Sequence, residues 1–303
     1  MEAPQRQLHR LEKIVALCAL FAVLALTFGF AQAEPRNKKQ HAAESQEPVH
    51  PEKLFLRSSV ALVQDVTSGE TLLAKNVDAV LPIASITKLM TALVLLDRGV
   101  DMDARVAISA EDQDFLKGTR SRLRNGTVLT RSELLMLALM SSENRAAASL
   151  ARTFPGGFDV FVAAMNEKAG SLGMADSHFV DSTGLSSANV SSAQDLGRLV
   201  VAAYAQPLIR EYSTRESAQV QVFGRPLEFR NTNGLVRSAS WNIGLSKTGY
   251  ISEAGRCLVM RARVAGKDLV VVLLDSWGKY SRAADANRIR KWLETNLARG
   301  HRG

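Results

Sequence analysis

Apolar strand-like runs lie at both ends of the region expected to fold, and helical stretches lie between them. Near its start, "SSVALVQDVTSGETLLAKN" (58–76) has two apolar runs around a Thr-Ser-Gly turn, which predicts a β-hairpin. Near its end, "RCLVMRARVAGKDLVVVLLDS" (256–276) has two runs around an Ala-Gly-Lys-Asp turn. We therefore expect one antiparallel sheet that both ends of the chain complete, flanked by helices, with a helical lobe at about 110–215 inserted into it. This architecture is α+β.

The stretches between and after these runs show helical patterning. Thr130 and Glu133 form a capping-box pair at the start of a helical stretch that the polar cluster "SSEN" (141–144) interrupts. Gly99 marks the end of an earlier helix. Strand-like runs recur at 218–223 and 227–232. The helices are expected at 85–97, 130–152, 157–171, 191–206 and 281–298.

The first 53 residues are expected to lie outside the folded domain, which we assign to residues 54–303. A basic start, the apolar run "IVALCALFAVLALTFGF" (14–30) and the small-residue site "AQA" indicate a secretory signal peptide over 1–33. The alternative is an uncleaved anchor, since the run approaches the length of a spanning helix. Residues 34–53 are polar and proline-punctuated, which predicts a flexible arm. The protein is thus expected to be exported, with a periplasmic location. Cys257 is then the only cysteine left, and we expect it to be buried.

The net charge of +8 predicts a loose association with an anionic wall or membrane surface. Nucleic acid is not an expected partner, because no finger, RNP-like or basic-zipper pattern is present. The densest basic stretch is "KGTRSRLRNGTVLTR" (117–131). It is either a solvated loop or one wall of a groove for an acidic polymer.

The sequence lacks the residues needed for histidine-based serine hydrolysis, for zinc binding and for nucleotide binding. His178 is the only histidine in the folded region away from the end of the chain, and no Gly-x-Ser-x-Gly elbow accompanies it. No His-Glu-x-x-His motif or cysteine pair offers zinc ligands, so no metal is expected. Glycine-rich phosphate-binding loops are also missing, and no cofactor is expected. A hydrolase of this sequence would need a base other than histidine.

Near the start of the apolar segment "LPIASITKLMTALVLLD" (81–97), Lys88 could be such a base and Ser85 the nucleophile. Residues three apart share a helix face, and the helix N-terminus directs free N–H groups toward an oxyanion. The alternative is a capping serine beside a lysine that reaches solvent. The Ser-x-x-Lys spacing alone is weak, because Ser276 and Lys279 repeat it after a strand.

A base at neutral pH requires a lysine whose pKa lies well below its model value of about 10.4. Burial and a second cation both lower the pKa of an amine. Ile86, Leu89, Met90 and Leu93 would provide the apolar surroundings. The single "KTG" (Lys247, Thr248 and Gly249) would provide the second cation, and a glycine in a strand typically marks a close backbone approach. The N–H of Tyr250 could then be an oxyanion donor.

In this order, "SITK", a Ser-x-Asn and "KTG" resemble the three motifs of penicillin-binding proteins and serine β-lactamases. Three Ser-x-Asn candidates exist, at 142–144, 187–189 and 240–242. We choose Ser142 and Asn144, because they end an apolar helical run where a helical lobe could meet the sheet. "LKGTRSRL", "HFVDSTGL" and "LSKTGYISEAGRCLVM" extend the resemblance to the low-molecular-mass D-alanyl-D-alanine peptidases, most of all the endopeptidases of the penicillin-binding protein 7 type.

The resemblance implies a penicillin-binding-protein-like fold and a role for each residue. Ser85 would be the acylated nucleophile, Lys88 its general base, and Ser142 a proton relay toward the leaving amine. Asn144 would position Lys88 and the substrate amide, while Lys247 and Thr248 would hold a carboxylate. The N–H groups of Ser85 and Tyr250 would form the oxyanion hole.

The family implies hydrolysis of D-alanyl bonds in cross-linked peptidoglycan peptides, with β-lactams as covalent inhibitors. The sequence contains no Glu-x-x-Leu-Asn stretch, the element that supplies a deacylating glutamate in many β-lactamases, so we do not expect a β-lactamase. The short segment after the last strand favours an endopeptidase over a carboxypeptidase that trims pentapeptides. A non-catalytic wall-binding module is the alternative from another class.

Overall fold

The structure is a computed structural model, and it describes residues 54–300. The predicted signal peptide (1–33) and polar arm (34–53) lie outside the described residues. Across 54–300, none of the helices has both the length and the apolar character needed to span a membrane.

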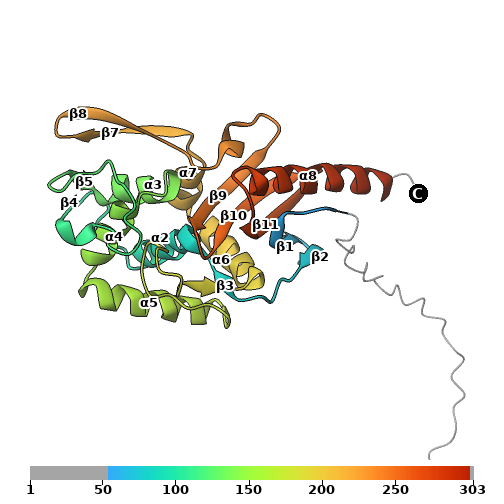
Figure 1. The fold of residues 1–303 in the computed structure, drawn as a ribbon, viewed down its shortest axis with the longest axis horizontal. Coiled ribbons are helices and arrows are strands. Elements are labelled where there is room, and N and C mark those ends of the chain that lie inside the picture. Colours follow the sequence, from blue (N-terminus) through green and yellow to red (C-terminus); the bar gives the residue numbers. More distant parts are fainter. Residues whose placement is uncertain (1–53, 301–303) are drawn as a thin grey trace, which may run out of the picture. The chain divides into compact units, whose positions relative to one another are not determined.

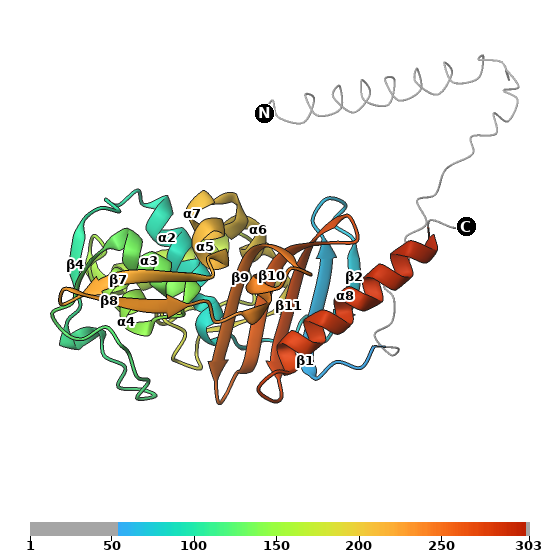
Figure 2. The same ribbon diagram turned by 90° about the horizontal axis from the view of Figure 1, so that it is seen from above.

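The centre of the fold is a five-stranded antiparallel sheet in the order β2–β1–β11–β10–β9 (Figure 2). β1 pairs with β11 from Ser58 opposite Ser276 to Asp65 opposite Leu269. The two ends of the folded chain therefore complete one sheet, as predicted. The strands are β1 (Ser58–Asp65), β2 (Thr71–Lys75), β9 (Asn242–Ile251), β10 (Gly255–Val264) and β11 (Lys267–Ser276).

The sheet separates two apolar cores, because alternate side chains of a strand face opposite sides. In β11, Val270 and Val272 belong to the larger core with helix α6 (Ala193–Ala205), whereas Val271 and Leu273 belong to a smaller core under helix α8 (Ser281–Gly300). Cys257 of β10 is fully buried in the larger core, as predicted. With both faces covered, the strands are long continuous apolar runs rather than alternating ones.

The remaining helices pack mainly on one another, beyond the β9 edge of the sheet (Figure 1). α2 is surrounded by α3, α4, α5 and α6, whereas α7 contacts β9. α6 falls within the predicted inserted lobe of 110–215, yet it packs against the sheet. The helices are α2 (Lys88–Asp97), α3 (Arg131–Met140), α4 (Asn144–Arg152), α5 (Gly157–Ser171) and α7 (Pro207–Thr214).

Short elements connect these helices to the sheet. Among them the β7–β8 hairpin extends over α3 and α4 (Figure 2). α7 and the β4–β5 pair were not expected from the sequence, because their apolar patterns are short. The short strands are β3 (Leu81–Pro82), β4 (Arg105–Ala107), β5 (Val128–Thr130), β6 (Val190–Ser191), β7 (Ser217–Val222) and β8 (Arg225–Arg230); the 3-10 helices are η2 (Ala84–Thr87), η3 (Ala110–Asp112) and η4 (Gly234–Arg237).

Candidate active site

Ser85 and Lys88 lie where η2 continues into α2, with Ser85 Oγ and Lys88 Nζ 2.9 Å apart. In a 3-10 helix, residues three apart are aligned along the axis, so this short turn brings the two side chains together. Lys88 is fully buried and does not reach solvent. The N-cap residues are Ile83 and Thr87, so Ser85 is not a helix cap. The structure thus contradicts the alternative of a capping serine beside a solvent-directed lysine.

Two carbonyl oxygens complete the surroundings of the Lys88 amine. Lys88 Nζ lies 2.8 Å from Asn144 Oδ1 and 2.6 Å from the backbone oxygen of Thr183. These oxygens can only accept hydrogen bonds, whereas the Ser85 hydroxyl can also donate. A neutral amine has two N–H donors and one lone pair. The three oxygens can accept the three N–H groups of a charged Lys88, and a neutral Lys88 can donate to both carbonyls and accept the proton of Ser85.

Burial lowers the pKa of Lys88 to about 7, although the negative charges of Asp181, Glu143 and Asp114 oppose the shift. The apolar flank expected from the sequence is present, since Ile86, Leu89, Met90 and Leu93 are all buried. A substantial fraction of Lys88 is therefore unprotonated at neutral pH.

Lys247 is the second buried amine of the site. Its Nζ lies 2.9 Å from Ser142 Oγ and donates to the carbonyl oxygen of Thr248 at 2.8 Å. Its pKa is held well below its ordinary value, first by burial and then by the positive charges of Lys88 and Arg282. The positive charge of Lys88 thus lowers the pKa of Lys247, but Lys247 is not among the groups that shift the pKa of Lys88, which burial alone lowers. The expectation that the second cation lowers the pKa of Lys88 is therefore not met.

Ser142 and Asn144 lie at the turn between α3 and α4. The N–H groups of Ser141 and Glu143 both donate to the carbonyl oxygen of Leu137, and Ser142 adopts a left-handed φ of 59°. This conformation costs energy in a residue other than glycine. Such strained residues are common at functional positions. Asn144 begins α4, and its Nδ2 donates to Thr119 Oγ1 at 2.9 Å. This is the Ser-x-Asn pair chosen from the sequence.

The two other Ser-x-Asn candidates have different surroundings. Asn189 is buried, and its Oδ1 accepts hydrogen bonds from the N–H groups of Val180 and Asp181. Ser240 Oγ lies 2.9 Å from Ser238 Oγ in an exposed turn before β9. The second Ser-x-x-Lys also lies elsewhere, since Ser276 is buried at the end of β11 with its Oγ 2.5 Å from Ser58 Oγ.

Two glycines allow the backbone to close around η2. A Cβ on Gly249 would lie 2.9 Å from the oxygen of Ile83 and 3.1 Å from the nitrogen of Ser85. A Cβ on Gly184 would lie only 1.9 Å from the oxygen of Ala84, and Gly184 has a φ of 78°. The close approach predicted for Gly249 is therefore present. It brings the backbone of β9, just before Tyr250, against the N–H of Ser85.

The ring of Tyr250 lies at the surface. It is 56% exposed, and the guanidinium carbon of Arg256 lies 4.5 Å from its centroid. Only the backbone N–H of Tyr250 was predicted to act in catalysis, and that role stays a prediction.

Sequence reasoning missed several groups that support the site. Thr232 Oγ1 lies 2.6 Å from Thr248 Oγ1, and Arg282 Nη1 donates to the oxygen of Gly249 at 3.0 Å. Asp181 Oδ1 accepts from the N–H groups of Thr183 and Gly184, which fixes the loop that presents the Thr183 carbonyl. Every residue has a backbone carbonyl, so the sequence cannot indicate which carbonyl contacts Lys88. The quoted stretch "HFVDSTGL", which contains Asp181 and Thr183, was the only available signal.

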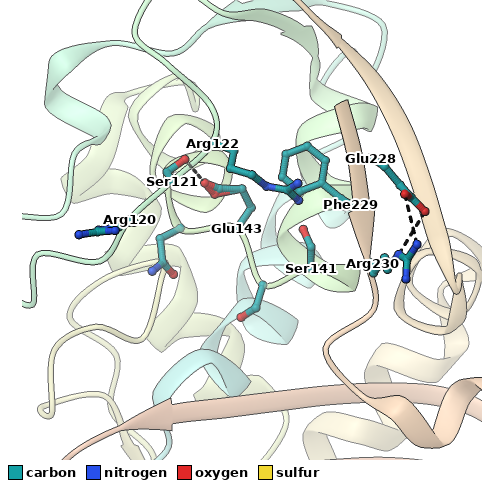
Figure 3. Close-up of a pocket in the computed structure, with 10 residues that line it drawn as sticks. Arg120, Ser121, Arg122, Ser141, Glu143, Glu228, Phe229 and Arg230 are labelled. Atoms are coloured by element: carbon teal, nitrogen blue, oxygen red, sulfur yellow. Dashed lines mark hydrogen bonds and ion pairs between the residues drawn. The ribbon is translucent and has the colours of Figure 1, made fainter. Parts of the chain in front are cut away.

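A cavity of about 480 Å3 adjoins Ser142 and Asn144, between the loop at 120–122 and β8 (Figure 3). Arg120 and Arg122 of the basic stretch 117–131 line it. Lys117 of the same stretch forms an ion pair with Glu253.

Known proteins resemble this chain in sequence and in fold. The family model described as D-alanyl-D-alanine carboxypeptidase matches residues 45–278. A D-alanyl-D-alanine endopeptidase of Pseudomonas aeruginosa is 50% identical over 243 residues, which cover 79% of this chain and 78% of that protein. One of Escherichia coli is 43% identical over 284 residues, covering 93% and 88%. The crystal structure of a Streptomyces DD-transpeptidase superposes with a TM-score of 0.73 at 27% identity, covering 78% of this chain and 97% of that one. The expected fold class is confirmed.

Proposed function

The chain belongs to the D-alanyl-D-alanine carboxypeptidase family of serine peptidases, and we propose that it is an exported, periplasmic endopeptidase that hydrolyses D-alanyl cross-links of peptidoglycan. The observation that carries the chemistry is the triple contact of Lys88 Nζ with Ser85, Asn144 and Thr183. The names of the two most similar relatives reported above favour the endopeptidase activity.

Acylation begins when neutral Lys88 takes the hydroxyl proton of Ser85 and Oγ attacks the D-alanyl carbonyl carbon. The developing oxyanion receives hydrogen bonds from the N–H groups of Ser85 and Tyr250. The C–N bond then breaks, and Ser142 relays the proton to the leaving amine. The product of this half-reaction is an ester on Ser85.

In deacylation, water takes the place of Ser85 as the nucleophile, and Ser85 becomes the leaving group. Lys88 is again unprotonated, takes a proton from a water molecule, and the resulting hydroxide attacks the ester carbonyl. Ser85 leaves with the proton that Lys88 returns. Asn144 holds the amine of Lys88 in place in both steps, and its Oδ1 contact of 2.8 Å supports that role.

The carboxylate next to the scissile bond is assigned to Lys247 and Thr248. Thr232 supplements Thr248, since their hydroxyl oxygens are 2.6 Å apart. The role of Gly249 is steric, because the absence of a side chain lets β9 approach Ser85. β-Lactams are expected to acylate Ser85 as substrate mimics.

Labelled penicillin tests the enzymatic proposal directly. We expect the wild-type protein to take one covalent label and the Ser85→Ala variant to take none. Ser276→Ala is the matched control, because it removes the serine of the second Ser-x-x-Lys spacing. Equal labelling of wild type and Ser85→Ala, or no label on either, would leave the wall-binding module as the better account.

Purified substrates separate the two peptidase activities. Cross-linked muropeptide dimers and monomeric pentapeptides would be digested in parallel and the products separated by chromatography. We expect dimers to be converted to monomers. Release of terminal D-alanine with intact dimers would instead establish the carboxypeptidase activity that the family description names.

A further inference from the structure

The cavity beside Ser142 and Asn144 is unusually rich in arginine. Arg120 and Arg122 come from the loop before β5, and Arg230 comes from β8 on the opposite wall (Figure 3). A second cavity of about 740 Å3 shares Ser121 and Arg122 with the first and adds Arg124 and Arg225. We call these five arginines and the two adjoining cavities the arginine pocket.

Arg122 lines both cavities, and its guanidinium group packs on an aromatic ring. Its guanidinium carbon lies 4.1 Å from the centroid of Phe229, so one face of the group packs on the ring (Figure 3). Within residues 54–300, the Arg122 side chain has no hydrogen bond or ion pair. Packing fixes its orientation, while its N–H edges remain available for a planar anion.

The carboxylates in the pocket do not neutralise it. Glu143 is buried against Ser121, and burial raises the pKa of its carboxyl. Arg230 donates to both carboxylate oxygens of Glu228, at 3.2 and 3.4 Å, but the two side chains are 73% and 44% exposed, and the attraction between such exposed charges is weak. The two cavities are therefore lined by five arginines and only two glutamates.

The position of the pocket decides which part of a substrate can reach it. The pocket begins at Ser142, the residue assigned to deliver a proton to the leaving amine. A terminal D-alanine ends at Lys247 and Thr248 and has no group that extends further. In a cross-link, the leaving amine belongs to a second peptide strand, which continues beyond the scissile bond and carries free carboxylates.

We infer that the arginine pocket binds the free carboxylates of the second peptide strand of a cross-link, the strand that leaves with the amine. The inference rests on the proposed endopeptidase function and gives it a physical basis. Arginine suits this ligand, because its planar N–H groups match the two oxygens of a carboxylate. The two cavities share Ser121 and Arg122, so they give the strand a positively charged path that starts at Ser142 and Asn144.

The test compares substrates with and without the second strand. In the Arg122→Gln/Arg230→Gln double variant, kcat/KM for cross-linked dimers should fall about tenfold, which is the effect of losing roughly 1.4 kcal/mol of charge-assisted binding. Penicillin acylation and turnover of monomeric pentapeptides should stay at the wild-type level. Arg263→Gln, an exposed arginine of β10, is the matched control and should behave as wild type.

A substrate change tests the same idea without any variant. Dimers whose second-strand carboxylates have been converted to amides should be cleaved about tenfold more slowly by the wild-type protein. Unchanged cleavage of amidated dimers, or an equal loss on dimers and monomers in the double variant, would overturn the inference. So would loss of polyphosphate binding in the double variant with dimer cleavage intact, which would assign the arginines to a phosphate polymer.

Binding separates failure of this inference from failure of the proposed function. Dimers should bind the catalytically silent Ser85→Ala protein more tightly than monomers, and the arginine substitutions should remove that difference. If the wild type cleaves no dimers, the endopeptidase proposal fails whatever the binding result. If it cleaves them and the binding difference is missing, only the arginine pocket is wrong.

Discussion

The amine nitrogen of Lys247 lies 2.9 Å from the hydroxyl oxygen of Ser142, 105 residues earlier in the chain. This contact joins β9 to the turn between α3 and α4. Because Lys88 contacts Asn144 in the same turn, both buried amines are attached to one short segment. The turn between the helices therefore sets the distance between the two amines.

The rate of Ser85 acylation should rise with pH through about 7. Burial lowers the pKa of Lys88 to about 7, and only the unprotonated amine can take the serine proton. Stopped-flow acylation by penicillin from about pH 5 to pH 9 measures the profile. The Lys88→Arg variant keeps a cation that stays protonated, so it should be inactive throughout. A wild-type rate independent of pH would contradict the assignment of Lys88 as the base.

Lys88 should also make stability depend on pH. Its pKa is about 7 in the folded state and 10.5 in the unfolded chain, so folding releases its proton between these values. In that window the unfolded state binds more protons, and stability rises with pH. Relative to Lys88→Met, the free energy of unfolding of the wild type should increase by about 1.4 kcal/mol per pH unit. Urea unfolding at several pH values tests this, and a constant difference between the two proteins would refute it.

Replacing Gly249 by alanine should impair acylation more than folding. The added Cβ would lie 2.9 Å from the oxygen of Ile83 and 3.1 Å from the nitrogen of Ser85, so β9 must move away from the nucleophile. We expect a penicillin acylation rate at least about tenfold lower, because misplacement of reacting groups is costly. Gly170→Ala is the control, since nothing lies within 4 Å of its new Cβ. An unchanged rate in Gly249→Ala would show that the close approach is not needed.

Arg282 should act as a positioning residue through the Gly249 peptide group. Its Nη1 donates to the oxygen of Gly249 at 3.0 Å and to that of Cys257 at 3.3 Å. The same peptide group carries the N–H of Tyr250, so the guanidinium polarises that donor. Burial lowers the pKa of Arg282 to about 10, which still leaves it charged at neutral pH.

The Arg282→Gln variant should therefore acylate about tenfold more slowly, since one oxyanion donor is weakened. Loss of its positive charge should also raise the pKa of Lys247, which the charge of Arg282 lowers in the wild type. The alkaline limb of the profile, where Lys247 loses the proton that binds the substrate carboxylate, would shift upward, whereas the rise near pH 7 that Lys88 sets would not move. Arg282→Lys should restore part of both effects. A purely structural role would lower the thermal stability without moving the pH profile.

Local sequence patterns predicted many of the candidate site residues that the structure brings together. The Ser85–Lys88 spacing, the single "KTG" and the apolar flank around Leu89 follow from residue identity and from helical periodicity, which are local properties. The pairing of both ends of the chain in one sheet was predictable from the strand-like runs. The capping box of Thr130 and Glu133 was also correct.

The way in which these residues meet depends on contacts between distant segments of the chain. Gly184 and Gly249 close around η2 from distant segments, and this packing presents the carbonyl of Thr183 to Lys88. Thr232 opposite Thr248 and Arg282 on Gly249 likewise depend on long-range contacts. Local patterning cannot specify such contacts, because they depend on which apolar faces pack together across the chain. The burial that lowers the pKa of Lys88 is a property of that packing.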